Sequence, residues 1–384
     1  MKPINNQVVP IRITSAREFC IMSMPELAEQ IGVTRQAVSK YEMGSIKPSM
    51  EVLMEISKIT GFPIKYFFKP VDILNSENSE ILLFRGPRSK NQKNIKSYRR
   101  VAEFVNEIIE FYSKYVSLFD VNIPDNIEFA YDDFDAEQKI ESIAAELREF
   151  WNIGKSPIND IVGLLENNGF ILSILPYKNQ KIDAYSLYRK GRPYIFFSGK
   201  RTSAVSYNFS LCHELGHLLL HRDMTEEELG DKEIYNKLEY QANLFAGAFL
   251  LPAETFSREY ITSNLNSFIS IKKRWRASLG AMIFRAAHLN IISENNKEYL
   301  FKQLNGKGYK LKEPYDDEII FKKPSLLYNI LMLLLDNKII SFDEFLNVSL
   351  LPNRLLSSIC CLPSDFEEKY MNVPRIVPTI RKVM

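Results

Sequence analysis

The chain has 384 residues, 46% of them hydrophobic and 25% charged, which is the composition of an ordinary globular protein with room for two or three domains of about 150 residues each. Its net charge is only +2, so any affinity for nucleic acid has to come from a local basic surface. The sequence holds no apolar run of membrane-spanning length and residues 1–6 hold no signal-peptide core, so we expect a cytoplasmic protein with no membrane partner.

Residues 15–68 show short blocks of helical periodicity separated by turn residues, which predicts five short helices in succession. Gly32 ends the second of these helices, and Thr34 caps a third helix over residues 35–42. Because only a tight turn separates the two helices, the segment is predicted to be a helix-turn-helix, whose second helix enters the major groove of DNA.

Four polar residues occupy the start and the exposed face of this third helix. Arg and Gln side chains can form paired hydrogen bonds to guanine and adenine, and Ser and Lys can bind a base or a phosphate. The alternative is a solvated face of a helical bundle. The predicted DNA-contacting residues are Arg35, Gln36, Ser39 and Lys40.

The pattern Glu26-Leu-Ala-x-x-Ile-Gly-Val-Thr34, followed by Val-Ser-x-Tyr-Glu-x-Gly and a proline, resembles the XRE family of phage Cro/C1 repressor-like proteins. The likeness covers residues 15–68. It implies that operator DNA in double-stranded form is a partner, that the four polar residues face the DNA, and that the chain forms a homodimer on a palindromic site.

Residues 71–130 follow no single periodic template, and we predict a linker that contains a connecting helix over residues 101–118. The segment 85–100 carries seven basic residues and no acidic residue. It is predicted either to lie along the phosphate backbone of DNA or to form an exposed, solvated loop.

Helices and a small sheet are predicted next along the chain. Apolar periodicity indicates a helix over 135–151, and a second helix opens at 157–160. Alternating and β-branched runs then predict three strands, at 170–175, 183–188 and 194–197.

The segment 209–221 contains three of the four histidines of the chain. Residues four apart share one face of a helix, so His213 and His217 can bring two imidazole nitrogens to one metal ion. Glu214 flanks the same site and can take a proton from a metal-bound water, which predicts a Zn²⁺ cofactor and hydrolytic chemistry. Taken alone, the motif fits a zinc site and its alternative equally well. In the alternative, both histidines are hydrogen-bonded core or surface groups.

A catalytic zinc ion keeps three protein ligands, so a third ligand is required downstream. The candidates are His221, Asp223, Glu226 to Glu228, Glu233 and Glu239. A straight helix cannot bring a third turn to the same ion, which gives His221 a supporting or structural role. Glu239 begins a helix with small and aromatic residues on its packing face. We predict Glu239 as the third ligand and Asn243, one turn later, as a hydrogen-bonding partner within the site.

Several motifs together resemble the ImmA/IrrE family of metallopeptidases over residues 135–315. They include Ala144-x-x-Leu-Arg-x-x-Trp151, the His213-Glu-Leu-Gly-His217 segment, Glu239-x-x-Ala-Asn-x-Phe-Ala246, and Lys273-Arg-Trp-x-x-Ser278. The resemblance implies that His213, His217 and Glu239 bind zinc, that Glu214 is the general base, and that the protein substrate is an XRE-type repressor cleaved at one site.

The chain departs from this family at residues 206–208 and at Ser210 and Cys212. These departures bear on substrate choice, because the four metal-site positions are intact. The donor to the transition-state oxyanion stays open among four tyrosines: Tyr185, Tyr188, Tyr194 and Tyr207.

The C-terminal third is predicted to be helical. Residues 268–292 are basic and form either a second DNA-contacting module or a solvated face over a packed core. A further helical pair is predicted at 326–335 and 341–345, as an interaction or dimerisation element.

The predicted fold class is multidomain and mainly α with a small β-sheet (α+β). The predicted domains are a helix-turn-helix bundle at 1–70, the linker at 71–130, a zincin-like metallopeptidase domain at 131–260 and a C-terminal helical domain at 261–384. The predicted function is a DNA-binding regulatory zinc metallopeptidase that cleaves a repressor. The alternative is a transcriptional repressor or antitoxin-like regulator whose zincin domain senses a ligand or stabilises a dimer.

Overall fold

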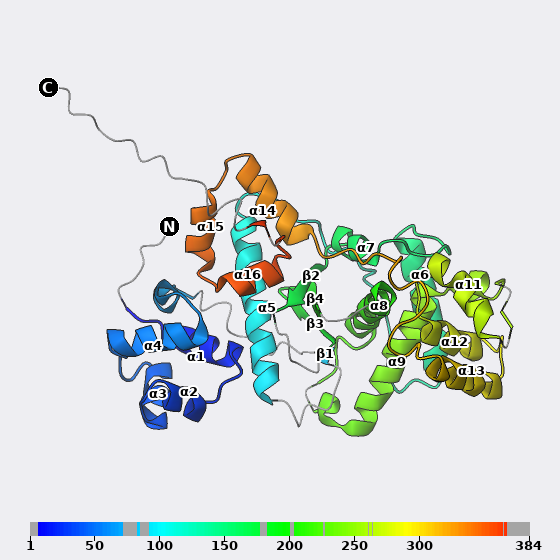
Figure 1. Ribbon diagram of the computed structural model, residues 1–384, viewed down its shortest axis with the longest axis horizontal. Helices are drawn as coiled ribbons and strands as arrows, with labels where there is room; N and C mark the ends of the chain where they lie inside the picture. The colour runs from blue at the N-terminus through cyan, green and yellow to red at the C-terminus, as the bar shows by residue number, and fades with distance from the viewer. Residues whose placement is uncertain are drawn as a thin grey trace.

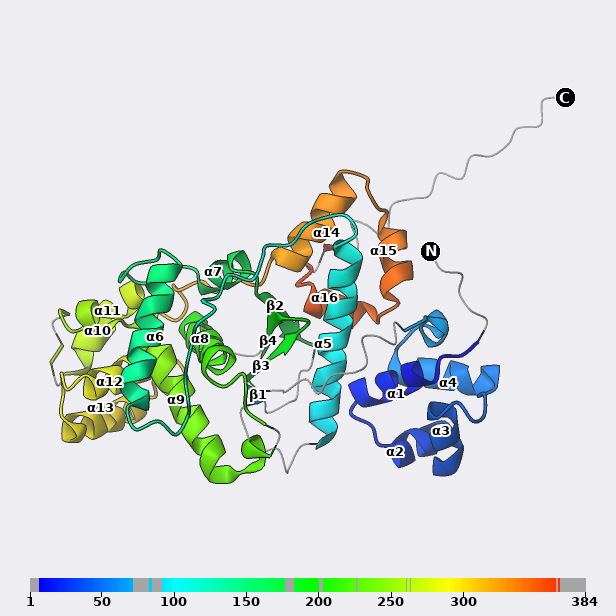
Figure 2. The same ribbon diagram turned by 180° about the vertical axis from the view of Figure 1, so that it is seen from behind.

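The computed structural model describes residues 7–71, 83–84, 92–176, 183–199, 203–225, 227–259, 261–262, 264–363 and 365–366. It confirms a mainly helical, multidomain protein with one small sheet (Figure 1). A helical bundle lies at one end, a long helix stands beside the sheet in the middle, and further helices form the other end, as the reverse view also shows (Figure 2).

The N-terminal bundle forms the predicted helix-turn-helix. Local capping explains where its helices begin, because Ser23 forms a capping box with Glu26 and Thr34 accepts a hydrogen bond from the backbone of Ala37. Its elements are α1 Pro10–Phe19, α2 Met24–Gln30, α3 Arg35–Glu42, α4 Met50–Thr60 and the 3₁₀ helix η1 Ile64–Phe68.

The connecting helix α5, Gln92–Tyr112, begins nine residues before the predicted start at residue 101. Its first turns bury Ile95 and Tyr98, and Ser97 Oγ donates a hydrogen bond to Phe19 O at 2.8 Å. Residues 92–100 are therefore helical and docked on the bundle, which excludes the alternative of an exposed loop for this part of the basic segment. Residues 85–91 of the same basic segment lie outside the described residues.

The sheet has four strands in the order β1-β3-β4-β2. β1 pairs antiparallel with β3, β3 pairs antiparallel with β4, and β2 pairs parallel with β4. Three strands match the predicted ones, whereas β1 was not predicted from the sequence. The bounds are β1 Leu83–Phe84, β2 Ile171–Leu175, β3 Ala184–Arg189 and β4 Arg192–Ser198.

Alternate residues of β2, β3 and β4 enter two different cores, because successive side chains of a strand point to opposite faces. Tyr194 and Phe196 pack with α5 and the bundle, whereas Ile195 and Phe197 pack with the helices on the other face. That second face is covered by α7 Ile161–Asn167 and α8 Ala204–Leu220, and α9 Lys232–Leu250 and α6 Ala136–Phe150 pack beyond α8 in the same core.

The predicted helical stretch 268–292 is broken into two helices at Arg276, whose backbone is left-handed with φ 50°. Lys272 is fully buried and paired with Asp316, and Arg285 is buried and paired with Glu141. These two basic residues therefore lie in the core and belong neither to a solvated face nor to a DNA-contacting surface. This region contains α10 Ala253–Phe256, α11 Leu265–Trp275, α12 Leu279–His288 and α13 Glu294–Gly306.

The last described helices return to the middle of the molecule, beside α5 (Figures 1 and 2). Their apolar side chains share a core with α5 and with the helix-turn-helix bundle, and not with α11 to α13. They are α14 Leu326–Asp336, α15 Phe342–Ser349 and α16 Asn353–Ile359. None of the helices in the described part of the chain combines the length and apolar character that a bilayer crossing requires.

Candidate metal centre

Helix α8 carries the polar triplet His213, Glu214 and His217 in an otherwise apolar, buried segment. The three residues are between 1% and 3% exposed, so each needs a polar partner inside the protein. Helix α9 packs against α8 and supplies the next polar group, Glu239. The close approach of the two helices depends on Gly216, since a Cβ there would meet Phe245 and Ala242 at 3.1 to 3.3 Å.

The histidines and Glu239 point their ligand atoms at one another. His213 Nε2 and His217 Nε2 are 3.1 Å apart, and Glu239 carboxylate oxygens lie 3.6 Å from the first and 3.4 Å from the second. Atoms that bind one tetrahedral zinc ion lie about 3.3 Å apart, because each bond is about 2.0 to 2.1 Å long. Among the described residues this is the one group of three His, Cys, Asp or Glu side chains placed to hold a metal ion.

Hydrogen bonds fix which nitrogen of each ring faces this centre. His213 Nδ1 lies 2.9 Å from Asn243 Oδ1, which can only accept, so the proton of His213 is on Nδ1. His221 Nε2 lies 3.1 Å from Gln241 Oε1, which likewise only accepts, so His221 Nδ1 accepts from His217 Nδ1 at 2.9 Å.

Both Nε2 atoms at the centre therefore carry lone pairs. Two lone pairs facing each other at 3.1 Å repel unless a cation lies between them. Two imidazole nitrogens and a carboxylate also form a donor set that zinc prefers. The residues present thus fit a zinc ion.

The carboxylate of Glu239 is held in its charged form. Burial alone would raise its pKa, but the neighbouring side chains of His217, His213 and Tyr235 lower the pKa to about 2. Tyr235 OH donates a further hydrogen bond to Glu239 Oε1 at 2.7 Å. For His221, burial and the neighbouring His217 lower the pKa well below its usual value, so this ring stays neutral.

Glu214 lies beside His213 on α8 and faces the sheet. Ser186, on β3, donates a hydrogen bond from Oγ to Glu214 Oε2 at 2.8 Å and is itself fully buried. A buried carboxylate fixed in this way next to a metal centre can accept a proton from a bound water. Ser186 and Gln241 were not predicted, since no local sequence pattern marks them. Tyr235 was missed because the predicted helix began at Glu239, whereas α9 begins at Lys232 and places Tyr235 one turn before Glu239.

The other candidate ligands lie apart from the centre. Asp223 has a 93% exposed side chain, and Glu228 accepts hydrogen bonds from Thr225 as a local cap. Glu233 is exposed at the start of α9, and Glu226 lies outside the described residues.

Three of the four candidate tyrosines donate their hydroxyl groups to other acceptors. Tyr185 OH donates to Tyr98 O, Tyr194 OH to Asn106 Oδ1, and Tyr207 OH to Ser198 O. Burial raises the pKa of Tyr188 to about 12.

The predicted DNA-contacting residues lie on α3, at one end of the molecule, and α5 and the sheet stand between α3 and helices α8 and α9 (Figure 1). Arg35, Gln36 and Lys40 are exposed, and Ser39 is half-buried. Val38 on the inner side of the same helix is fully buried, which fixes the face that α3 presents.

Two family models match the chain. A helix-turn-helix model covers residues 15–67, and a model described as the IrrE N-terminal-like domain, peptidase M78, covers residues 168–287. The second range includes all three residues of the candidate metal centre and Glu214.

Curated relatives carry matching names. An HTH-type transcriptional regulatory protein of Pyrococcus furiosus is 31% identical over 22% of this chain and 26% of its own length, and an HTH-type transcriptional regulator of Sinorhizobium fredii is 44% identical over 18% and 47%. A prophage-derived HTH-type transcriptional regulator of Bacillus subtilis is 30% identical over 21% of this chain and 82% of its own length. The chain thus spans about a quarter of the length of the Pyrococcus furiosus protein and about half of the length of the Sinorhizobium fredii protein. It belongs to the XRE-type helix-turn-helix transcriptional regulators and joins to that module an IrrE N-terminal-like domain.

Proposed function

We propose that this chain is a DNA-binding regulatory zinc metallopeptidase that controls transcription by cleaving a repressor protein at one site. The observation that supports it most is the convergence of two unprotonated imidazole nitrogens and the Glu239 carboxylate beside the buried carboxylate of Glu214. Structural zinc sites are closed by four protein ligands, whereas catalytic sites have three and keep one position open. The three-residue group found among the described residues favours the catalytic kind.

In this proposal His213, His217 and Glu239 bind the zinc ion, and Asn243 and His221 orient the two imidazole rings. Bound zinc supplies Lewis-acid chemistry and lowers the pKa of a water molecule to about 7. Glu214 accepts the proton of the attacking water and delivers it to the leaving amine of the scissile peptide. Ser186 holds the carboxylate of Glu214 in place through its hydrogen bond to Oε2.

The helix-turn-helix module brings this chemistry to DNA. We propose that Arg35, Gln36, Ser39 and Lys40 contact the operator and that the substrate is an XRE-type repressor, another protein or a copy of this chain. Arg35→Ala is expected to weaken operator binding by about 1–3 kcal/mol and to relax the preference at one base pair. Titration of the protein with operator variants tests this, and unchanged binding would remove Arg35 from the interface.

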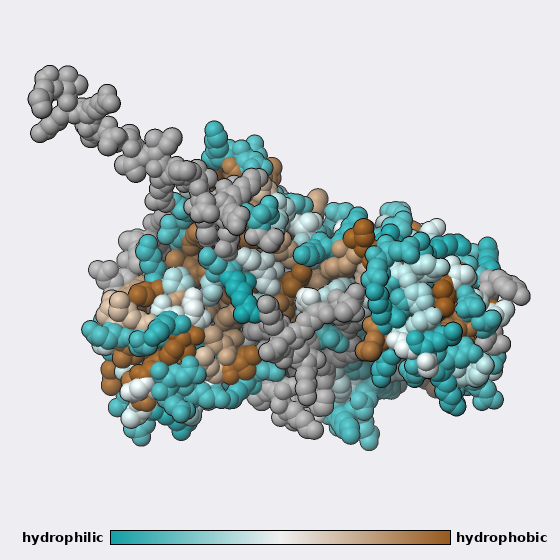
Figure 3. Space-filling model, in the orientation of Figure 1, coloured by the Kyte–Doolittle hydropathy of each residue, from teal (hydrophilic) through white to brown (hydrophobic). Residues whose placement is uncertain are grey.

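A homodimer on a palindromic site and a cytoplasmic location are part of the same proposal. Exposed apolar side chains gather on the α3 and α4 side of the bundle, where Figure 3 shows brown surface, and such patches are typical of protein contacts. They are Met43, Ile46, Met50 and Met54, between 47% and 68% exposed. Light scattering of the protein with and without operator measures the oligomeric state.

One observation favours a second candidate function. The curated relatives are named as transcriptional regulators and not as peptidases. In this alternative the chain is a repressor or antitoxin-like regulator, and its metal centre senses a ligand or stabilises the fold without hydrolysis.

Glu214→Gln separates the two functions because it keeps the metal ligands and removes the base. The peptidase proposal predicts that the purified variant retains one zinc ion per chain and loses its regulatory output in cells. Unchanged output with zinc retained supports the alternative. If the wild-type protein contains no zinc and His213→Ala changes nothing, the metal centre has no part in either function.

A further inference from the structure

The first turns of α5 lie against the helix-turn-helix module, although they belong to the segment that follows it. Lys93 Nζ lies 2.7 Å from Glu26 Oε2 at the start of α2, and Lys96 Nζ lies 3.5 Å from Glu18 Oε1 near the end of α1. These contacts and the hydrogen bond of Ser97 to Phe19 place two lysines beside the turn between α1 and α2.

A hollow in the surface extends from these lysines to the start of α3. Among the described residues, its lining contains four cations and one carboxylate, and the other lining residues, 22–25, are uncharged. The charged lining residues are Arg17, Arg35, Lys93, Lys96 and Glu18. Glu26 pairs with Lys93 and Glu42 pairs with Arg17, so four positive charges less three negative charges leave a local net charge of +1. A concave surface with this excess attracts an anion.

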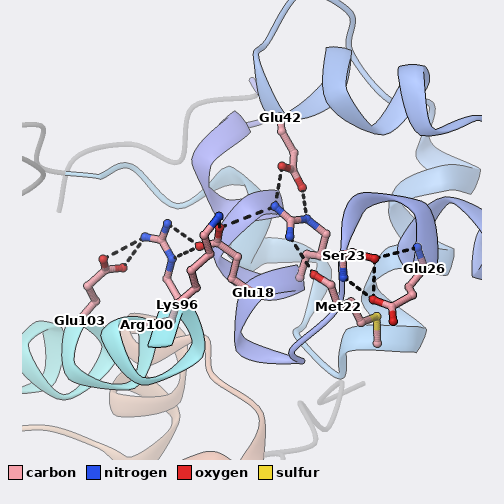
Figure 4. Close-up of polar contacts among 9 residues, drawn as sticks. Glu18, Met22, Ser23, Glu26, Glu42, Lys96, Arg100 and Glu103 are labelled. Atoms are coloured by element: carbon pink, nitrogen blue, oxygen red, sulfur yellow. Dashed lines mark hydrogen bonds and ion pairs between the residues drawn. The ribbon is translucent and has the colours of Figure 1, made fainter. Parts of the chain in front are cut away.

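The one carboxylate in the lining, Glu18, is already matched by Arg100, which does not line the hollow. Glu18 is 7% exposed, and its Oε2 lies 2.9 Å from Arg100 Nη2, whose guanidinium also contacts Glu103 (Figure 4). Lys96 lies farther from Glu18 than Arg100 does, and its side chain is 56% exposed. The side chain of Lys93 is 52% exposed. Both ammonium groups are therefore accessible to a ligand.

The hollow keeps a fixed position relative to α3. Arg17 Nε lies 2.6 Å from Oε1 of Glu42, the last residue of α3, and both side chains are at most 7% exposed (Figure 4). Arg35, the first residue of α3, lines the hollow itself. The surface formed by Lys93 and Lys96 is therefore continuous with the face of α3 that enters the major groove.

We propose that the first turns of α5 are part of the DNA interface, with Lys93 and Lys96 contacting the phosphate backbone that flanks the base pairs read by α3. This interface extends beyond the helix-turn-helix module, and it does not depend on the peptidase activity. The side chains of Lys93 and Lys96 carry no hydrogen-bonding pattern suited to a particular base in this position, so their contribution is independent of sequence.

The test measures binding of the full-length protein to a short random-sequence duplex across a range of salt concentrations. Each phosphate contact adds about 0.9 to the slope of log affinity against log salt. The double variant Lys93→Gln, Lys96→Gln is expected to reduce that slope by about 1 to 2 and to weaken binding roughly fivefold or more at moderate salt. The charge-conserving variant Lys93→Arg, Lys96→Arg should retain the wild-type slope.

Lys312→Gln is the matched control, because Lys312 also forms an exposed ion pair, with Asp317, in another part of the chain. It should leave affinity and slope unchanged. A wild-type slope in the glutamine double variant would overturn the proposal. So would a loss of affinity at unchanged slope, which would mean that the substitutions displace the bundle and remove no phosphate contact. Thermal unfolding of each variant confirms that it is folded.

Discussion

At the metal centre, single hydrogen bonds decide which nitrogen of each histidine carries the proton. Asn243 Oδ1 accepts from His213 Nδ1 at 2.9 Å and so directs the lone pair of Nε2 toward His217 and Glu239. Removal of such a supporting partner typically weakens metal binding 10- to 100-fold. The site geometry thus depends on a residue that need not touch the metal.

We predict that Asn243→Ala weakens zinc binding by about 10- to 100-fold, because the ring of His213 loses its preferred protonation and orientation. Competition with a chromophoric chelator measures the affinity. Asn236→Ala is the control, since Asn236 is exposed on the same helix. Equal zinc affinity in both variants would mean that Asn243 does not support the site.

A second residue-scale prediction concerns Glu141, which pairs with buried Arg285. Burial alone would raise the pKa of Glu141, but the hydrogen bonds from Arg285 and the neighbouring His288 lower it to about 2. Because the folded pKa lies below the unfolded value of about 4.3, this stabilisation is complete above that pH and is lost as pH falls toward 2.

Glu141→Gln should therefore lower the free energy of unfolding by roughly 1–3 kcal/mol at neutral pH, and this difference from wild type should shrink between about pH 4.5 and pH 2. Urea unfolding at several pH values measures it. Glu146→Gln, at an exposed position of the same helix, should change the free energy by less than about 0.5 kcal/mol. A difference that did not vary with pH would exclude the ionised pair as its source.

Residues marked by spacing or local chemistry could be predicted from the sequence, and residues joined only by packing could not. The spacing of His213 and His217 marks them as neighbours on a helix before any tertiary structure is known. Ser186 reaches Glu214 only because α8 packs on β3, and Gln241 reaches His221 only because α9 packs on α8. The residue roles at the site stay predictions until they are tested by substitution.

At the scale of elements, the approach of α8 to α9 places Glu239 opposite the histidines. Gly216 permits it, because a Cβ there would come within 3.3 Å of the Ala242 backbone and closer to Phe245. Gly216→Ala should therefore destabilise the protein by about 1–3 kcal/mol and weaken zinc binding as the helices separate.

Gly247→Ala on α9 is the matched control, since its Cβ would meet only Arg285 Cδ at an ordinary 3.7 Å. It should be neutral or stabilise the helix by up to about 1 kcal/mol. Thermal unfolding and zinc competition measure both variants. Equal behaviour of the two would contradict the role assigned to the close contact.

Elements with local signals were predicted, whereas those set by distant contacts were not. α3 and α6 have capping residues or apolar periodicity within their own sequence. The start of α5 is a basic stretch without a marked cap or a strong apolar repeat. Its position is set by contacts with Phe19, Glu18 and Glu26 of the bundle. β1 has only two residues and exists through its pairing with β3.

At the scale of the whole molecule, the sheet separates two cores, and α5 belongs to the core that contains the DNA-binding bundle. Helices α14 to α16 share that core, so the C-terminal segment joins the bundle to the sheet. The domain limits at residues 70, 130 and 260 stay predictions. The arrangement connects the helix-turn-helix bundle with the candidate metal centre through packed helices.

The central claim is that the metal centre cleaves a repressor, and one comparison tests it most directly. Cells that produce the wild-type protein and cells that produce Glu214→Gln are compared by mass spectrometry of the whole proteome, with zinc content checked in both purified proteins. The account predicts that one XRE-type protein is shortened at a single site only with the wild-type chain. Identical proteomes, with zinc retained in the variant, would contradict it.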